Sequence, residues 1–293
     1  MKTVAFIGLG NMGGPMAANL VKAKYSVKGF DLSEEAKAHS KSQGVDIVSS
    51  VEEAVTTADA VITMLPAGKH LLAVYEGALK AAKAGTLFID CSTIDVDSAR
   101  TAHQAATKAS MLSLDAPVSG GVGGATAGTL TFMAGGSKAA FDKAQELLSV
   151  MGGKIVHCGG DGNGQAAKIC NNMILGISMI ASAEAFNLAE KLGLDHQALF
   201  DVASTSSGQC WSINSYCPVP GPVPTSPANN DYKPGFAAAL MLKDLKLSQE
   251  AAKSSGVSTP LGAHAEELYQ LFNNEGGATT DFSGIIKFLK GEK

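Results

Sequence analysis

Short apolar runs alternate with segments of helical texture along the first half of the chain. The apolar runs are Thr3–Gly8, Ser26–Asp31, Ala60–Leu65, Thr86–Asp90, Leu112–Ala116, Leu130–Ala134 and Lys154–Cys158. Their lengths and continuous apolar character are typical of buried parallel strands. The helical segments are Gly10–Lys24, Glu34–Gln43, Lys69–Ala84, Asp95–Ser110 and Ser137–Met151. Alternation of this kind with short connections predicts βαβ units around a parallel sheet.

The pattern changes near Gly159. The glycine-rich run 159–164 indicates a flexible joint, and no strand-like run follows it. Residues 165–192 predict one long helix that is apolar nearly all round, and we expect it to be buried between domains or subunits. We therefore expect an α/β domain over residues 1–163 and an all-α domain over 164–293, joined by a long helix at about 164–192.

One segment of the second half has no helical texture. Trp211–Pro234 contains six of the ten prolines of the chain. Loops of this length without regular structure usually act as lids or binding loops. We therefore expect an aromatic wall there, which would favour a substrate that carries a methyl group.

Composition narrows the classes of function. Of the 293 residues, 45% are apolar and 17% are charged, which excludes a mainly disordered chain. A net charge of −4 and the lack of a basic tract argue against nucleic acid as a partner. The uncharged run 169–183, which contains Asn171 and Asn172, is too short and too polar to span a membrane. Five scattered cysteines without a C-x-x-C pair indicate reduced thiols, a cytoplasmic location and no metal site.

A glycine motif follows the first predicted strand. Gly8-Leu9-Gly10-Asn11-Met12-Gly13 has the G-x-G-x-x-G spacing of a dinucleotide-binding turn. The first glycine permits the tight turn, the second lets a pyrophosphate approach, and the third lets the helix pack on the sheet. Asp31 ends the next strand, where a carboxylate can accept hydrogen bonds from a ribose, so NAD is expected over NADP. The alternatives are a glycine-rich turn without a ligand and an aspartate that only caps a helix.

Further polar groups follow other strand ends. Met64-Leu65-Pro66 and Asp90-Cys91-Ser92-Thr93 end two strands and could flank a cofactor. In the run 115–124, the Ser119 hydroxyl and the unobstructed amides of Gly120 and Gly121 would suit a small carboxylate. From the residues alone, each of these segments could equally be an ordinary loop.

Two pairs of polar residues lie within apolar helices. Lys168 and Asn172 are four apart and so share one helix face. Such a lysine can give a proton to a carbonyl or take one from a hydroxyl, or it can simply extend its amine to solvent near the helix start. Lys243-Asp244 is a charged pair that could equally lie on a solvated face.

These pieces together resemble the β-hydroxyacid dehydrogenase family, most closely its 3-hydroxyisobutyrate branch. The segments 6–20, 115–121 and 164–172 and the pair Lys243-Asp244 match its four motifs in order. The resemblance implies a Rossmann-type N-terminal domain, a long helix and an all-α C-terminal domain, with the active site between them. It implies NAD, a small β-hydroxyacid substrate, no metal, and a homodimer or homotetramer.

The resemblance also implies roles for single residues. Lys168 would be the catalytic acid or base, and Asn172 would orient the substrate. Ser119, Gly120 and Gly121 would hold the substrate carboxylate. Cofactor contacts would come from Gly8, Leu9, Gly10, Asn11, Met12, Gly13, Asp31, Leu65, Pro66, His70, Thr93 and Lys243. Further substrate contacts would come from Trp211 and Asp244.

The implied reaction is NAD-dependent oxidation of 3-hydroxyisobutyrate to methylmalonate semialdehyde, a step of valine breakdown. Two alternatives stay open. One is a semialdehyde reductase of the same family that acts on tartronate, glyoxylate or succinic semialdehyde. The other is a dinucleotide-binding module without catalysis.

Overall fold

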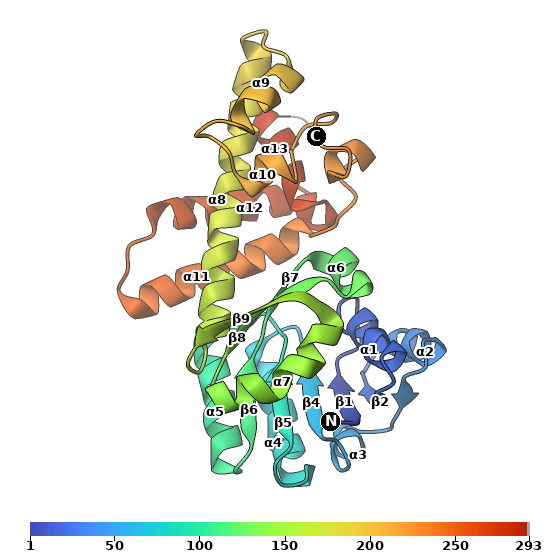
Figure 1. Cartoon of the computed structure of the whole chain (residues 1–293). Helices are drawn as coiled ribbons and strands as arrows, with labels where there is room; N and C mark the ends of the chain where they lie inside the picture. Colours follow the sequence, from blue (N-terminus) through green and yellow to red (C-terminus); the bar gives the residue numbers. More distant parts are fainter. Residues whose placement is uncertain (292–293) are drawn as a thin grey trace. The chain divides into compact units, whose positions relative to one another are not determined.

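The computed structural model describes residues 1–291, and the chain divides into two compact units, at Met1–Lys168 and from Ile169 onward. The first unit is built on one sheet (Figure 1). Its strands are β1 (Thr3–Ile7), β2 (Ser26–Phe30), β3 (Asp46–Ile47), β4 (Ala60–Thr63), β5 (Leu87–Asp90), β6 (Leu112–Asp115), β7 (Val118–Ser119), β8 (Leu130–Gly135) and β9 (Gly152–Gly159).

The strand order is β3-β2-β1-β4-β5-β6-β8-β7, and β9 pairs with β8. The strands β1 to β6 are parallel, whereas β8 runs antiparallel to β6 and β7. The parallel part has the order 3-2-1-4-5-6 of a doubly wound dinucleotide-binding sheet, which confirms the predicted Rossmann-type fold. The order reverses between β1 and β4, so the ends of these two strands form the switch point where ligands bind in such sheets.

Helices cover both faces of this sheet (Figure 1). They are α1 (Gly13–Lys22), α2 (Glu34–Ser42), α3 (Val51–Val55), α4 (Gly68–Ala81), α5 (Val96–Lys108), α6 (Gly121–Ala127) and α7 (Lys138–Met151). Successive strand residues point to opposite faces. Accordingly, Phe6 packs in a core with Met16 of α1, while Ile7 packs in a second core with Leu71 of α4.

The second unit is helical, as predicted. Its elements are the greater part of α8 (Asn163–Lys191), then α9 (His196–Ala203), α10 (Trp211–Asn214), η1 (Pro227–Asn230), α11 (Ala238–Ser255), α12 (Pro260–Asn274), η2 (Gly277–Thr279), η3 (Phe282–Gly284) and α13 (Ile285–Lys290). Its core gathers buried side chains from α8, α11, α12 and η3, among them Phe186, Met241, Tyr269 and Phe282.

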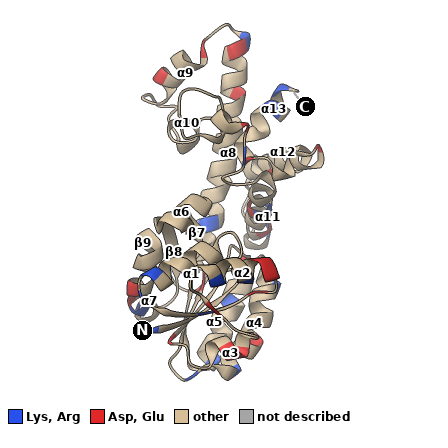
Figure 2. Ribbon diagram, turned by 90° about the vertical axis from the view of Figure 1, so that its right-hand side faces the viewer, with Lys and Arg blue, Asp and Glu red and all other residues tan. Residues whose placement is uncertain are grey.

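The long helix α8 meets the length and hydropathy criteria for a membrane span, with a mean hydropathy of 1.3 over its most apolar window. Its charge-free middle is visible in Figure 2. However, Met179, Ala183 and Phe186 lie in the core of the second unit. This packing accounts for the apolar character of α8 as that of a core helix.

The structure corrects three expectations about local structure. The strands β3 and β7 and the helices α3 and α6 were not predicted, because each is short and α6 contains three glycines. The glycine-rich run 159–164 is no loose joint, since a Cβ on Gly164 would lie 2.3 Å from the Met133 carbonyl oxygen. The segment 211–234 is not structureless, because it contains α10 and η1, and the buried Tyr232 hydroxyl donates a hydrogen bond to the Pro218 carbonyl at 2.8 Å.

Candidate active site

The glycine motif connects β1 to α1 through close backbone packing. Gly8 has φ +95°, and a Cβ there would lie 2.2 Å from the Met64 carbonyl oxygen. A Cβ on Gly13 would lie 1.9 Å from the Gly8 carbonyl oxygen. Gly10 is different, because it is exposed and no atom lies within 4 Å of its Cβ position. The outer two glycines are therefore required by the fold, while the middle one leaves the backbone accessible to a phosphate group.

Asp31 follows β2 and fixes the same loop. Its Oδ2 accepts a hydrogen bond from the Leu9 N–H at 2.6 Å, and its Oδ1 accepts one from the Ser33 N–H at 2.7 Å. The carboxylate is only half-buried. Asn11 is exposed and Met12 is half-buried beside this loop. Ser33 caps α2, so Asp31 is not needed as the helix cap and its accessible oxygens suit the ribose of a dinucleotide.

The ends of β4 and β5 are joined by a buried hydrogen-bond chain. The Ser92 hydroxyl accepts from the Leu65 N–H at 2.8 Å and donates to Asp90 Oδ1 at 2.6 Å. The Thr63 hydroxyl donates to the same oxygen at 2.6 Å. The turns that carry Leu65 and Thr93 are thereby fixed to each other. Pro66 follows Leu65 in the first of these turns, and His70 lies in the first turn of α4; both residues are exposed.

The Asp90 side chain, which accepts these hydrogen bonds, is buried. Burial raises its pKa to about 6, although the hydrogen bonds from Ser92 and Thr63 act in the opposite direction. The carboxyl group therefore changes its ionisation within the range in which enzymes operate.

The turn from β7 into α6 carries the residues predicted to hold a carboxylate. Gly120 has φ +133° and Gly121 has φ +61°, conformations that favour glycine. Gly120 is the N-cap of α6 and no side chain caps the helix there. Ser119 is half-buried and Gly120 is exposed. The hydroxyl of Ser119 and the adjacent backbone thus lie together in one turn of the first unit.

Lys168 belongs to the first unit and is only 6% exposed. The start of its helix is held by Asp115, which sequence reasoning did not single out. Asp115 Oδ1 accepts from the Gly162 N–H at 2.9 Å, and Oδ2 accepts from the Gln165 N–H at 2.8 Å. Buried His103 contacts Asp115 Oδ1 through Nε2 at 2.8 Å and the Ser113 hydroxyl through Nδ1 at 2.7 Å.

The second unit brings together three of the other predicted residues. Asn172 is 2% exposed and donates from Nδ2 to Asp244 Oδ2 at 2.5 Å. Lys243 Nζ lies 3.6 Å from Asp244 Oδ1. Trp211 instead stacks on Tyr216 with ring centroids 4.8 Å apart and is 52% exposed. Tyr216 is itself committed to the unit, because its hydroxyl donates to Asp281 Oδ2.

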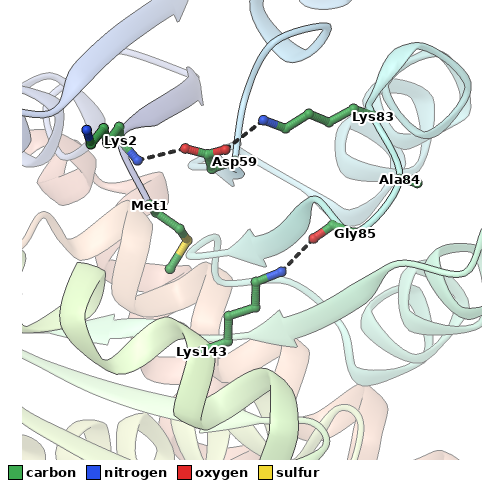
Figure 3. Close-up of a pocket in the computed structure, with 7 residues that line it drawn as sticks. All are labelled: Met1, Lys2, Asp59, Lys83, Ala84, Gly85 and Lys143. Carbon is green, nitrogen blue, oxygen red and sulfur yellow. Dashed lines mark hydrogen bonds and ion pairs between the residues drawn. The ribbon is translucent and has the colours of Figure 1, made fainter.

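A surface hollow of about 430 Å³ lies in the first unit, at the N-terminal ends of β1, β4 and β5. The glycine motif lies at the other end of these strands. Figure 3 shows its lining residues, Met1, Lys2, Asp59, Lys83, Ala84, Gly85 and Lys143. Lys83 pairs with Asp59 at 2.6 Å, and Lys143 donates to the Gly85 carbonyl at 2.5 Å. These contacts tie the strand ends together. Within residues 1–291, no group of His, Cys, Asp and Glu is arranged to hold a metal ion.

Comparison with known proteins identifies the chain at the level of family. Residues 3–160 match the NAD binding domain of 6-phosphogluconate dehydrogenase. Residues 162–289 match the family described as NAD-binding of NADP-dependent 3-hydroxyisobutyrate dehydrogenase. A probable 3-hydroxyisobutyrate dehydrogenase of Mycobacterium tuberculosis is 54% identical over 290 residues, which are 99% of this chain and 98% of the relative.

Two further proteins are similar over their whole length. The NAD-dependent L-serine dehydrogenase of Pseudomonas aeruginosa is 48% identical over 292 residues, covering 99% of this chain and 98% of the relative. A structure of Mycobacterium tuberculosis 3-hydroxyisobutyrate dehydrogenase with L-serine has a TM-score of 0.96 and 54% identity, and 99% of each chain is covered. NAD is accordingly the cofactor that the glycine loop and Asp31 fit. The chain belongs to the 3-hydroxyisobutyrate dehydrogenase family of NAD-dependent oxidoreductases.

Proposed function

We propose that this enzyme oxidises 3-hydroxyisobutyrate to methylmalonate semialdehyde, as a step of valine breakdown. The observation that carries the proposal is the burial of Lys168 in the same compact unit as the glycine loop and the Ser119–Gly121 turn. A buried amine is costly unless it is hydrogen-bonded or used in chemistry. Similarity over the full length to proteins named for this substrate supports the same reaction.

The proposed mechanism divides binding from proton transfer. The Ser119 hydroxyl and the Gly120 and Gly121 backbone hold the substrate carboxylate and so fix the orientation of C3. The Lys168 side chain acts as the base that accepts the proton of the 3-hydroxyl group as a hydride leaves C3. Asn172, held by Asp244, orients the substrate hydroxyl. Bound NAD⁺ supplies the hydride acceptor.

The remaining assignments concern the cofactor and the second unit. The loop 8–13 holds the pyrophosphate, Asp31 accepts from the ribose, and Leu65, Pro66, His70 and Thr93 contact the rest of the cofactor. Lys243 is assigned to the cofactor, and Trp211 and Asp244 are assigned to the substrate. Each assignment is testable by a single substitution with separate readouts for NAD and substrate.

L-Serine is a second candidate substrate, favoured by the L-serine dehydrogenase at 48% identity and by the related structure with L-serine. It has the same carboxylate and 3-hydroxyl, but an ammonium group replaces the methyl group at C2. We favour the methyl-bearing acid because the segment around Trp211 supplies aromatic side chains, Trp211 and Tyr216, that could face a methyl group. One methyl group is worth roughly 10–200-fold in discrimination.

We further propose a homodimer or homotetramer in the cytoplasm. Exposed apolar side chains support an assembly through the helical unit, namely Ile174 (63% exposed) and Leu188 (61%) on α8 and Leu192 (75%) directly after it. These three side chains lie near one face of the helix, and a second copy of the chain could cover them. Sedimentation of the purified enzyme would measure the assembly.

The decisive experiment is a substrate panel followed at 340 nm with NAD and NADP side by side. For oxidation, the panel contains 3-hydroxyisobutyrate, L-serine, 3-hydroxypropionate and the methyl ester of the first acid. For reduction, with NADH and NADPH, it contains tartronate semialdehyde, glyoxylate and succinic semialdehyde. We expect NAD to be preferred, 3-hydroxyisobutyrate to have the highest kcat/KM, and the ester to be poor. Reduction of tartronate, glyoxylate or succinic semialdehyde as the fastest reaction would instead establish the semialdehyde reductase. No turnover with any of them would leave a binding module.

A further inference from the structure

Gln165 uses its whole amide group to join α8 to the turn after β5. The side chain is fully buried, with 0% exposure. Its Oε1 accepts from the Ile94 N–H at 3.1 Å, and its Nε2 donates to the Ser92 carbonyl at 2.7 Å. The amide thus contacts both ends of the three-residue segment 92–94. A donor and an acceptor are both needed, and an amide supplies them in one plane.

The backbone of Gln165 provides a second anchor in another direction. Its N–H donates to Asp115 Oδ2 at 2.8 Å, while Asp115 Oδ1 accepts from the Gly162 N–H. A Cβ on Gly164 would lie 2.5 Å from the Asp115 carbonyl oxygen, so the helix start lies directly against the end of β6. The first turn of α8 is therefore fixed by β6 on one side and by residues 92–94 on the other.

Lys168 follows Gln165 by three residues, which places the two on adjacent turns of one helix face. The segment 92–94 contains Thr93, and Ser92 in turn holds the Leu65 N–H. Both Leu65 and Thr93 are assigned to the cofactor under the proposed function. A continuous set of buried hydrogen bonds therefore runs from the cofactor turns to the helix that carries the lysine.

We propose that Gln165 is a positioning residue, which sets the placement of Lys168 relative to the cofactor turns through its paired hydrogen bonds to Ser92 and Ile94. This inference rests on the proposed function. It assigns to Gln165 no contact with the substrate. Its effect is on geometry, because a displacement of about 1 Å in a reacting group can lower a rate by about 100-fold.

The test compares three variants with the wild type, all as the full chain. Gln165→Ala removes both hydrogen bonds, and Gln165→Glu keeps the size while placing an acceptor against the Ser92 carbonyl. Asn163→Ala is the matched control, because Asn163 lies in the same turn but donates to the Cys158 carbonyl at 3.0 Å. The readouts are kcat, KM, the dissociation constant of NAD, thermal stability, and the kinetic isotope effect with substrate deuterated at C3.

We expect kcat to fall by about 10- to 100-fold in both Gln165 variants, with the NAD dissociation constant within about threefold of the wild type. The isotope effect should rise, because hydride transfer becomes the slow step. Asn163→Ala should retain kcat within about twofold. Wild-type turnover in the same assay tests the proposed function separately from the variants.

Several results would overturn the positioning role. One is a Gln165→Glu variant that keeps wild-type kcat. Another is a fall in kcat for Asn163→Ala that equals the fall for Gln165→Ala, since general loosening of the helix start would then account for both. An unchanged isotope effect, or a loss confined to thermal stability, would also contradict it.

Discussion

The two parts of α8 are held in different ways. Its first turn is fixed by hydrogen bonds to buried polar groups of the first unit, through Asp115 and the segment 92–94. From Met179 to Phe186, the helix is instead held by apolar side chains in the core of the second unit. One helix therefore has a polar end and an apolar end.

The two kinds of contact differ in how strictly they fix position and in how much they stabilise the fold. A hydrogen bond requires a donor and an acceptor within a few tenths of an ångström and in line, so a set of them fixes position and rotation. Its net contribution to folding is only about 1 kcal/mol. Apolar packing contributes more free energy but tolerates exchange among residues of similar volume. We therefore expect substitutions at the polar end to change catalysis, and substitutions at the apolar end to change stability.

The largest effect is expected at Lys168. Lys168→Ala should lower kcat by roughly 10²- to 10⁴-fold, the usual contribution of a positioned acid or base. The dissociation constant of NAD and the melting temperature should change little. Lys168→Arg should not restore turnover, because a guanidinium does not release its proton near neutral pH. Lys191→Ala, at the exposed far end of the same helix, is the control. Retention of most turnover by Lys168→Ala would exclude the lysine from the mechanism.

The apolar end should respond in the opposite way. Phe186 is 1% exposed and packs edge-to-face with His196 at 5.8 Å between ring centroids. Phe186→Ala should lower the free energy of unfolding by about 3–5 kcal/mol, measured by urea denaturation. Below the denaturation range, kcat should stay near that of the wild type. Glu184→Ala on the exposed side of α8 should change stability by no more than about 0.5 kcal/mol. Equal effects of the two variants would contradict the apolar anchoring of this end.

A substitution at Asp31 tests whether this carboxylate, beside the glycine loop, takes part in binding the cofactor. Asp31→Asn should weaken NAD binding by about 1.5–3 kcal/mol through the loss of a charge-assisted hydrogen bond, and should reduce the bias against NADP. Isothermal titration with both cofactors measures this change. Asp46→Asn, on the exposed β3, serves as the control. A wild-type enzyme that binds NADP more tightly than NAD would refute the role of Asp31.

The smallest effect is expected at Asp90, whose carboxylate accepts the hydrogen bond from the Ser92 hydroxyl. Its pKa is raised to about 6 in the folded protein, so the native state binds more protons than the unfolded state between about pH 4 and 6. Stability is therefore lost as the pH rises through this range. Asp90→Asn should increase the free energy of unfolding at pH 8 by about 1–2 kcal/mol, because an amide avoids the buried charge but accepts weaker hydrogen bonds.

Urea denaturation of Asp90→Asn and the wild type at pH 8 and pH 4.5 measures this gain. The gain should shrink at the lower pH, where the folded carboxyl is already neutral. An equal gain at both values would show that the ionisation of Asp90 is not the cause.

The strand and helix pattern of the first unit could be predicted from the sequence because each long element has its own apolar signature. The glycine loop was also predictable, since Gly8, Gly10 and Gly13 follow a strand at a spacing set by local geometry. The short helix α6 was not, because three of its seven residues are glycines. Contacts from elsewhere stabilise it, such as the hydrogen bond from Asn19 Nδ2 to the Ala125 carbonyl at 2.8 Å.

The hydrogen bonds by which Gln165 and Asp115 fix the start of α8 could not be predicted either. The partners of Gln165 are Ile94 and Ser92, which precede it by 71 and 73 positions in the chain. No local sequence pattern indicates pairs that are so far apart. Asp115 begins the motif from which Ser119, Gly120 and Gly121 were selected, yet its own hydrogen bonds reach Gly162 and Gln165. Side chains that act through distant backbone groups have no spacing signature, whereas loop glycines do.

The shared helix also limits how relatives can exchange segments by recombination. The two matched family regions meet between residues 160 and 162, and this point is the obvious choice for joining parts of two homologous genes. A crossover there would draw Asp115 and Ser92 from one parent and Gln165 and Lys168 from the other. Such a hybrid inherits Lys168 from one parent and the residues that fix the start of its helix from the other. Crossovers after Lys168 would take Ser92, Asp115, Gln165 and Lys168 from the same parent. They should yield active hybrids more often.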